Sequence, residues 1–176
     1  SIVAEYRRKY TAMAALGVDI TLVTPPCWGS GGTRQDLEPG DPSGYRHLIL
    51  NPRLNGHFHL HHYPDLPELI SGLRPDIVHM DEEPYDYVTY AGMRAAARCG
   101  GRPVFFTWQN LERRLPPPFT FFLREAIRGS RGAIAGNAEA AAILSRRGWS
   151  GPLLLAPQLD RKSTRLNSSH VSESRM

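Results

Sequence analysis

The sequence has few cysteines and no long apolar run. Only two cysteines, Cys27 and Cys99, occur among its 176 residues, and their spacing fits no metal or redox motif. This excludes a disulfide-stapled scaffold and favours a reducing compartment, so we expect a cytoplasmic protein. No stretch approaches the roughly 20 apolar residues that span a bilayer. The chain does not open with a charged-then-apolar leader, so neither a membrane-spanning nor a secreted protein is expected.

The chain also has little net charge outside its last residues. Its 21 basic and 17 acidic side chains give a formal charge of +4, of which residues 161–176 supply four basic and one acidic residue. The remainder therefore has 17 basic against 16 acidic residues, a net charge of +1. Nucleic-acid-binding domains carry a strongly basic surface, so we do not expect nucleic acid as a partner.

Alternating strand and helix patterns fill most of the chain. Short apolar or β-branched runs bounded by proline, glycine or polar residues predict strands, and apolar stripes at helical spacing predict helices. The expected strands are 18–24, 46–50, 58–63, 77–80, 103–108, 132–136 and 152–156. The expected helices are 2–16, 65–73, 85–99, 116–127 and 137–148. The alternation predicts an α/β class, with a Rossmann-like, doubly wound and mostly parallel sheet covered by helices on both faces.

Composition predicts where this domain ends. Residues 1–159 are expected to form the domain, and residues 160–176 a disordered, non-native tail, because the tail shows no periodicity and no core-forming run. At the other end, a doubly wound sheet requires a strand before the first helix. We therefore expect about ten or more residues to precede this sequence, which makes it truncated at both ends.

Two local predictions concern helices. On the first helix, one apolar face is expected to hold Val3, Tyr6, Tyr10, Met13 and Gly17. The basic residues Arg7, Arg8 and Lys9 are expected to point mostly elsewhere. Before the second helix, Asp65 and Glu68 have the spacing of a capping box.

The most informative run is residues 74–84, in which a short apolar strand ends in Asp81, Glu82 and Glu83. In open α/β sheets, ligands bind outside the carboxyl ends of the strands, so these carboxylates are expected where a polar substrate binds. The alternative is an acidic turn that stabilises the positive end of the next helix. The residues alone leave both interpretations open.

Other polar groups follow neighbouring strands. Gln109 and Asn110 come directly after the 103–108 strand, and Asn137 is predicted to be the N-cap of the last helix. Trp108 has two interpretations, a buried core ring, which we favour, and a platform for a sugar face.

A histidine-rich stretch is the one candidate for a metal site. On a 58–63 strand, His57, His59 and His61 would share one face, a spacing that can hold zinc. No cysteine or carboxylate nearby completes an evident site, so no metal is predicted.

Four stretches resemble the amino-terminal domain of family 4 glycosyltransferases of the GT-B fold. They are Leu16 to Thr24, Arg74 to His79, Thr107 to Asn110 and Gly136 to Glu139. The resemblance implies an enzyme that transfers a sugar, with retention of configuration, from a nucleotide-sugar to an acceptor glycan, lipid or small molecule. This chain would be the acceptor-binding half. A missing carboxy-terminal domain would hold the donor, without a further cofactor. Membrane-surface association at the inner face is left open, because the first helix carries a short basic run.

Within this resemblance, Glu83 and then Glu82 are the candidates for the catalytic base. Asp81, Gln109, Asn110, Asn137 and Glu139 are the candidates for substrate binding. Many family members have a histidine near the end of the strand that corresponds to 103–108. This sequence has none there, so Gln109 and Asn110 are assigned to binding rather than catalysis.

Three alternatives accompany this prediction. A non-catalytic Rossmann-like module that binds a sugar or nucleotide would share the fold, and so would half of a nucleotide-sugar epimerase. A metal hydrolase built on the histidine stretch is the third. The fragment alone is expected to be inactive, because half of the expected cleft is missing.

Overall fold

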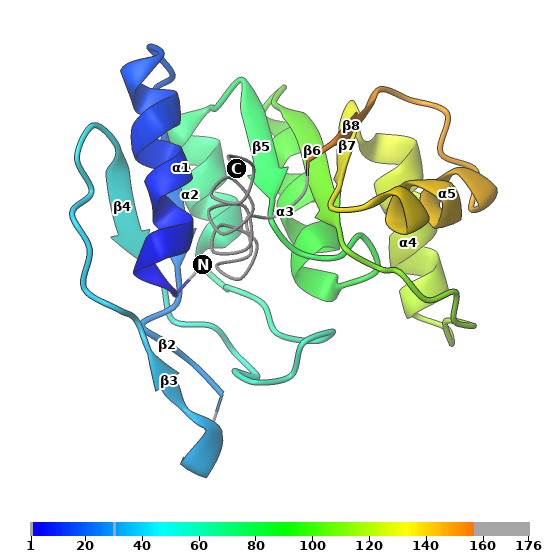
Figure 1. Cartoon of the computed structure of the whole chain (residues 1–176), viewed down its shortest axis with the longest axis horizontal. Helices are drawn as coiled ribbons and strands as arrows, with labels where there is room; N and C mark the ends of the chain where they lie inside the picture. The colour runs from blue at the N-terminus through cyan, green and yellow to red at the C-terminus, as the bar shows by residue number, and fades with distance from the viewer. Residues whose placement is uncertain (1, 30, 157–176) are drawn as a thin grey trace, which may run out of the picture.

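A computed structural model describes residues 2–29 and 31–156 and shows helices packed on parallel strands (Figure 1). The helices are α1 (Ala4–Ala15), α2 (Leu66–Leu73), α3 (Tyr87–Arg98), α4 (Phe119–Gly129) and α5 (Ala138–Arg146), with a short 3-10 helix η1 (Gly31–Thr33). The strands are β1 (Thr21–Thr24), β2 (Cys27–Trp28), β3 (Gln35–Asp36), β4 (Arg46–Ile49), β5 (Ile77–Met80), β6 (Arg102–Thr107), β7 (Gly132–Ala135) and β8 (Leu153–Leu155). The predicted α/β, Rossmann-like class is confirmed.

The parallel strands form two groups. One sheet has the order β5-β6-β7-β8, and a separate parallel pair joins β1 to β4, while β2 and β3 form an antiparallel hairpin. Within the described residues, β1 and β5 are not hydrogen-bonded neighbours. The strand expected before α1 lies outside the sequence and stays a prediction. The predicted tail, 160–176, lies outside the described residues.

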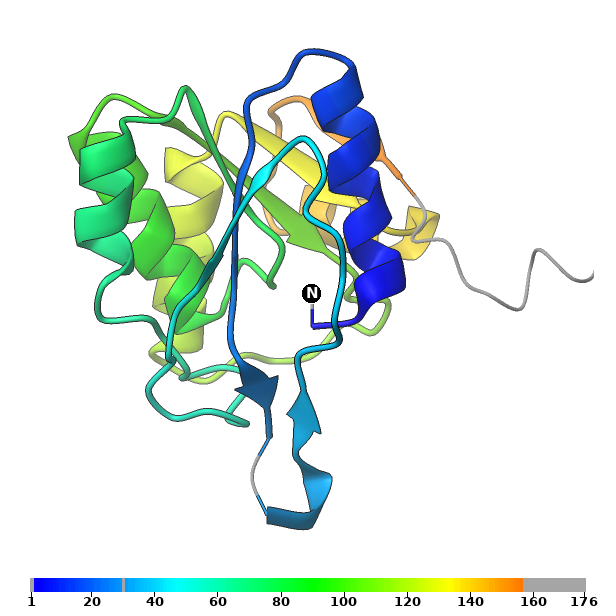
Figure 2. The same cartoon turned by 90° about the vertical axis from the view of Figure 1, so that its left-hand side faces the viewer.

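The core lies between the four-stranded sheet and the helices that pack on it. Val78 and Met80 of β5 pack against α2 and α3, and Phe105 of β6 packs against Leu144 and Trp149. Figure 2 shows α1 on the opposite side of the strands from α2 and α3. Helices therefore lie on both faces, as predicted.

The predicted faces of α1 are only partly correct. Tyr10 is buried, as predicted, but so is Arg7, whereas Tyr6 and Met13 are 46% and 42% exposed. The Arg7 guanidinium donates to the carbonyl oxygens of Ile2 and Glu38, so it ties α1 to the loop after β3. An arginine that satisfies backbone carbonyls is stable in a buried position, which an amphipathic pattern does not predict.

The predicted 58–63 strand is also wrong. Turns occupy this stretch, and its one bridge pairs Arg53 with His62. His61 turns inward, where its ring is buried against the edge of the Trp28 ring and its Nδ1 lies 2.9 Å from the carbonyl oxygen of Phe58. The alternating face of histidines on which the zinc reading depended does not form.

The predicted capping box at α2 does not form either. Asp65 has helical backbone angles and makes no side-chain cap hydrogen bond. Proline is present in the first turn, where its fixed φ favours helix initiation without a cap. By contrast, Asn137 caps α5 as predicted, with its Oδ1 accepting from the N–H of Ala140 at 2.7 Å.

Candidate functional site at the carboxyl ends of the strands

The parallel register brings the predicted site residues to one edge of the sheet. Met80 lies opposite Phe105, and Thr107 lies opposite Ala135. The loops that follow β5, β6 and β7 therefore leave the sheet side by side. They carry the predicted residues Asp81, Glu82 and Glu83, then Gln109 and Asn110, then Asn137 and Glu139.

Glu83 joins the end of β5 to the end of β6. One carboxylate oxygen accepts a hydrogen bond from Thr107 Oγ1 at 2.7 Å, and the other accepts from the N–H of Trp108 at 2.8 Å. Burial raises the pKa of the half-buried Glu83, and the bonds from Thr107 and Trp108 oppose this rise. The carboxylate is thus held in one orientation at the edge of the sheet.

Glu82 and Asp81, the two carboxylates that precede Glu83 in the sequence, have pKa values shifted in opposite directions. Desolvation, followed by the negative charges of Asp86 and Asp81, raises the pKa of Glu82 to about 7, although its side chain is exposed. Burial would also raise the pKa of Asp81, but the ammonium of Lys9, 3.1 Å away, lowers it overall. Near neutral pH, Asp81 is therefore ionised while Glu82 can take up or release a proton, as acid–base catalysts do.

The remaining predicted residues differ in whether the fold already uses their side chains in a hydrogen bond. Gln109 Oε1 accepts from Arg147 Nη1 at 2.8 Å, whereas Asn110 is exposed. Asn137 uses its oxygen to cap α5, and Glu139 is exposed in the first turn of that helix. Asn137 therefore has a structural task that competes with ligand binding through Oδ1.

Trp108 is more exposed than the favoured interpretation predicts. Its side chain is 41% exposed, and its ring stacks on Phe106. Gly136, at the end of β7, has no Cβ and so leaves room for the indole, because a Cβ there would lie 1.7 Å from the ring atom Cε3. A buried core ring is thus the wrong interpretation, and a partly open aromatic surface lies beside Glu83.

The structure also brings together a pair that the sequence did not reveal. His59 Nδ1 lies 2.7 Å from the carboxylate oxygen Oδ1 of Asp86, whose side chain is 4% exposed, while that of His59 is 53% exposed. Burial and the negative charge of Glu83 raise the pKa of Asp86 to about 8. In the sequence, the only indication of this pair was an aspartate in the turn before α3. Because residues 58–63 were predicted to form a strand, His59 was not recognised as its partner.

Asp86 is expected to make the free energy of unfolding fall as pH rises. Between the ordinary carboxyl pKa of 3.8 and the folded value of about 8, the folded chain holds a proton that the unfolded chain has released. The stabilisation is therefore complete below the lower value and lost towards the upper one. Asp86→Asn should remove up to about 1.4 kcal/mol per pH unit from this slope in urea unfolding. Exposed Asp65→Asn is the control, and parallel curves for Asp86→Asn and wild type would contradict the prediction.

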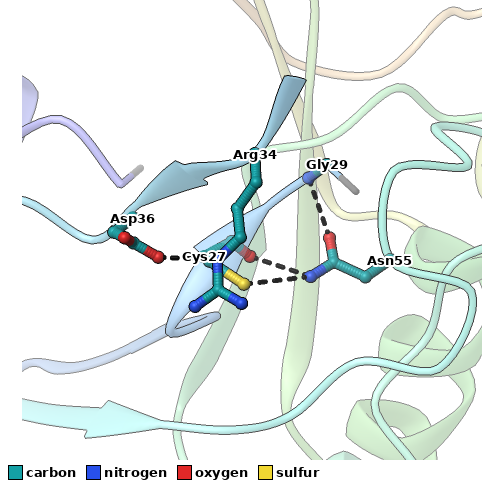
Figure 3. Close-up of polar contacts among 5 residues, drawn as sticks. All are labelled: Cys27, Gly29, Arg34, Asp36 and Asn55. Carbon is teal, nitrogen blue, oxygen red and sulfur yellow. Dashed lines mark hydrogen bonds and ion pairs between the residues drawn. The ribbon is translucent and has the colours of Figure 1, made fainter. Parts of the chain in front are cut away.

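The loop that follows β4 borders the same edge. It reaches α3 through the His59–Asp86 pair and through the bond from the Tyr87 N–H to the His59 carbonyl oxygen. Asn55 attaches the β2–β3 hairpin to this loop, as Figure 3 shows: its Oδ1 accepts from the Gly29 N–H at 3.2 Å, and its Nδ2 donates to the Cys27 carbonyl oxygen at 3.1 Å. Hairpin and loop therefore form one rim of the site.

Residues 3–157 match a family model described as a glycosyl transferase 4-like domain. This match covers most of the chain. The chain belongs to this family. The resemblance to the amino-terminal domain of family 4 glycosyltransferases is thereby confirmed. No curated protein matches the sequence.

Two further findings describe this glycosyl transferase 4-like domain. Across residues 2–29 and 31–156, no three or more His, Cys, Asp or Glu side chains are grouped so that they could hold a metal ion. None of the described helices is both long and apolar enough to cross a membrane.

Proposed function

We propose that this glycosyl transferase 4-like domain binds the acceptor in a sugar-transfer reaction at the carboxyl ends of β5 and β6. The observation that carries the proposal is Glu83, which is hydrogen-bonded to Thr107 and Trp108 beside the partly exposed indole. Each carboxylate oxygen has two lone pairs, so Glu83 can accept another hydrogen bond while it keeps both existing ones. An acceptor hydroxyl is a suitable donor.

In the proposed reaction, the acceptor oxygen bonds to the anomeric carbon of a nucleotide-sugar while the bond from that carbon to the diphosphate breaks. The hydroxyl proton passes to a carboxylate, for which Glu83 and Glu82 are the candidates. The raised pKa values of both groups favour this role, because a general base works best with a pKa near the working pH. Retention of configuration at the anomeric carbon is included in the proposal only because the chain belongs to this family.

The other predicted residues have supporting roles in this proposal. Asp81, Gln109 and Asn110 would bind sugar hydroxyls, and Glu139, at the start of α5 on the same edge, would help to bind the substrate. The Trp108 ring offers an apolar surface to a sugar ring. A second domain would supply the groups that bind the nucleotide diphosphate, so the chain alone would have no site for the leaving group.

The proposal predicts acceptor binding without turnover for the 176-residue chain. Titration with short oligosaccharides should change the tryptophan fluorescence in a saturable way. Trp108→Phe should abolish the change, because it removes the exposed indole. Trp28→Phe is the matched control and should retain it. No free nucleoside diphosphate should form from any nucleotide-sugar.

Two results would overturn this assignment. Sugar transfer by the chain alone would show that the donor site is not on a second domain. Release of nucleoside diphosphate without a glycosylated product would favour the epimerase alternative.

A further inference from the structure

A hollow of about 230 Å³ lies between the loop after β6, helix α4 and the end of α5. Three arginines from these three segments line it, Arg113, Arg124 and Arg147. Ligand pockets for whole small molecules have volumes of roughly 300–1,000 Å³. This hollow therefore suits a single charged group rather than an entire sugar.

None of the three guanidinium groups forms an ion pair within the described residues, although the charge of Arg147 is close enough to Glu83 to lower the pKa of that carboxyl. In the described part of the chain, no carboxylate lies within 4.0 Å of Arg113, Arg124 or Arg147, although Arg128, one turn along α4 from Arg124, pairs with Glu125. Residues 91–150 contain ten arginines, no lysine and three glutamates. Positive groups around one hollow attract an anion and raise its local concentration.

One of the arginines is held in place. Arg147 donates to Gln109 Oε1 at 2.8 Å and to the Arg113 carbonyl oxygen at 2.9 Å. These bonds fix the guanidinium before any ligand arrives and connect the hollow to Gln109 in the candidate site. Leu115, Leu123 and Ile127 also line the hollow. Apolar side chains lower the local dielectric on their side of the hollow, which strengthens interactions between charges.

We infer that this hollow binds a phosphate ester group of the acceptor. Planar guanidinium groups match the oxygens of phosphate by paired hydrogen bonds, and three of them suit its double charge better than the single charge of a carboxylate. The link through Gln109 places such a group beside the edge where the acceptor hydroxyl is proposed to bind. The identification of the ligand as an acceptor rests on the proposed function, whereas phosphate binding does not.

The test uses glycerol 3-phosphate as the probe, titrated into the whole chain at constant ionic strength and followed by calorimetry. Saturable binding is expected, and Arg113→Gln or Arg124→Gln should weaken it at least about tenfold, the usual loss for one charge-assisted contact. Arg128→Gln is the matched control on the same helix and should leave the affinity unchanged. Arg147 is not substituted, because its loss would also release Gln109.

Several outcomes would overturn the inference. These are an absence of saturable binding, an equal loss with Arg128→Gln, or equal binding of chloride. Retention on vesicles that contain phosphatidic acid, without binding of glycerol 3-phosphate, would assign the arginines to a membrane surface instead. If the chain binds glycerol 3-phosphate but its fluorescence does not respond to oligosaccharides, the hollow is a phosphate site and the proposed function is wrong.

Discussion

Replacement of Glu83 by Gln is expected to lower sugar transfer by about 10²–10⁴-fold, the range for loss of a general base, in an enzyme that carries this domain together with its donor domain. Gln has the shape of Glu, and its amide oxygen can still accept from the Trp108 N–H while its amide nitrogen donates to Thr107 Oγ1. The fold should therefore survive. The measurement is steady-state transfer, with thermal unfolding recorded alongside.

Two comparisons make this prediction specific. Glu68→Gln, on the exposed side of α2, is the control and should have the wild-type rate. Glu82→Gln tests the second candidate, because the pKa of Glu82 near 7 also suits proton transfer. If both Glu82→Gln and Glu83→Gln are stable and transfer sugar at near wild-type rates, the proposed base is wrong, although the fold is unaffected.

Gly136→Ala is expected to have the largest effect on stability, about 3 kcal/mol, at the upper end for overpacked sites. The added Cβ would lie 1.7 Å from Trp108 Cε3 and 2.1 Å from Cζ3, so the indole must leave its position. The end of β7 cannot move away easily, because the Gly136 N–H donates to the Thr107 carbonyl oxygen at 2.9 Å. The free energy of unfolding in urea measures the loss.

A double-mutant cycle identifies the cause of this loss. In a Trp108→Ala background, Gly136→Ala should cost much less, because the ring that the Cβ meets is absent. Gly72→Ala is the control, since no atom lies within 4 Å of a Cβ there. Alanine in that α2 position should be neutral or stabilising by up to about 1 kcal/mol. Equal costs of Gly136→Ala in both backgrounds would rule out contact with Trp108 as the reason.

Predictions from sequence were correct where the signal is local. Asn137 was identified as a cap because its side chain bonds to an N–H three residues later. The strand ending at Met80 was identified because a short apolar run stops at carboxylates. Predictions failed where a distant group decides the outcome. Arg7 is buried because carbonyls from another loop surround it, and His61 turns inward because Trp28 packs on it.

The sequence by itself therefore determined the α/β class, the strands of the main sheet and the edge at which Asp81, Glu82 and Glu83 lie. Strand and helix periodicities are properties of neighbouring residues, and parallel strands bring their carboxyl ends to one side. Only the tertiary structure decided that Glu83 bonds to Thr107, that His59 meets Asp86 and that three arginines line one hollow. These contacts join residues far apart in the chain, and packing between whole elements, rather than any local pattern, sets which of them meet.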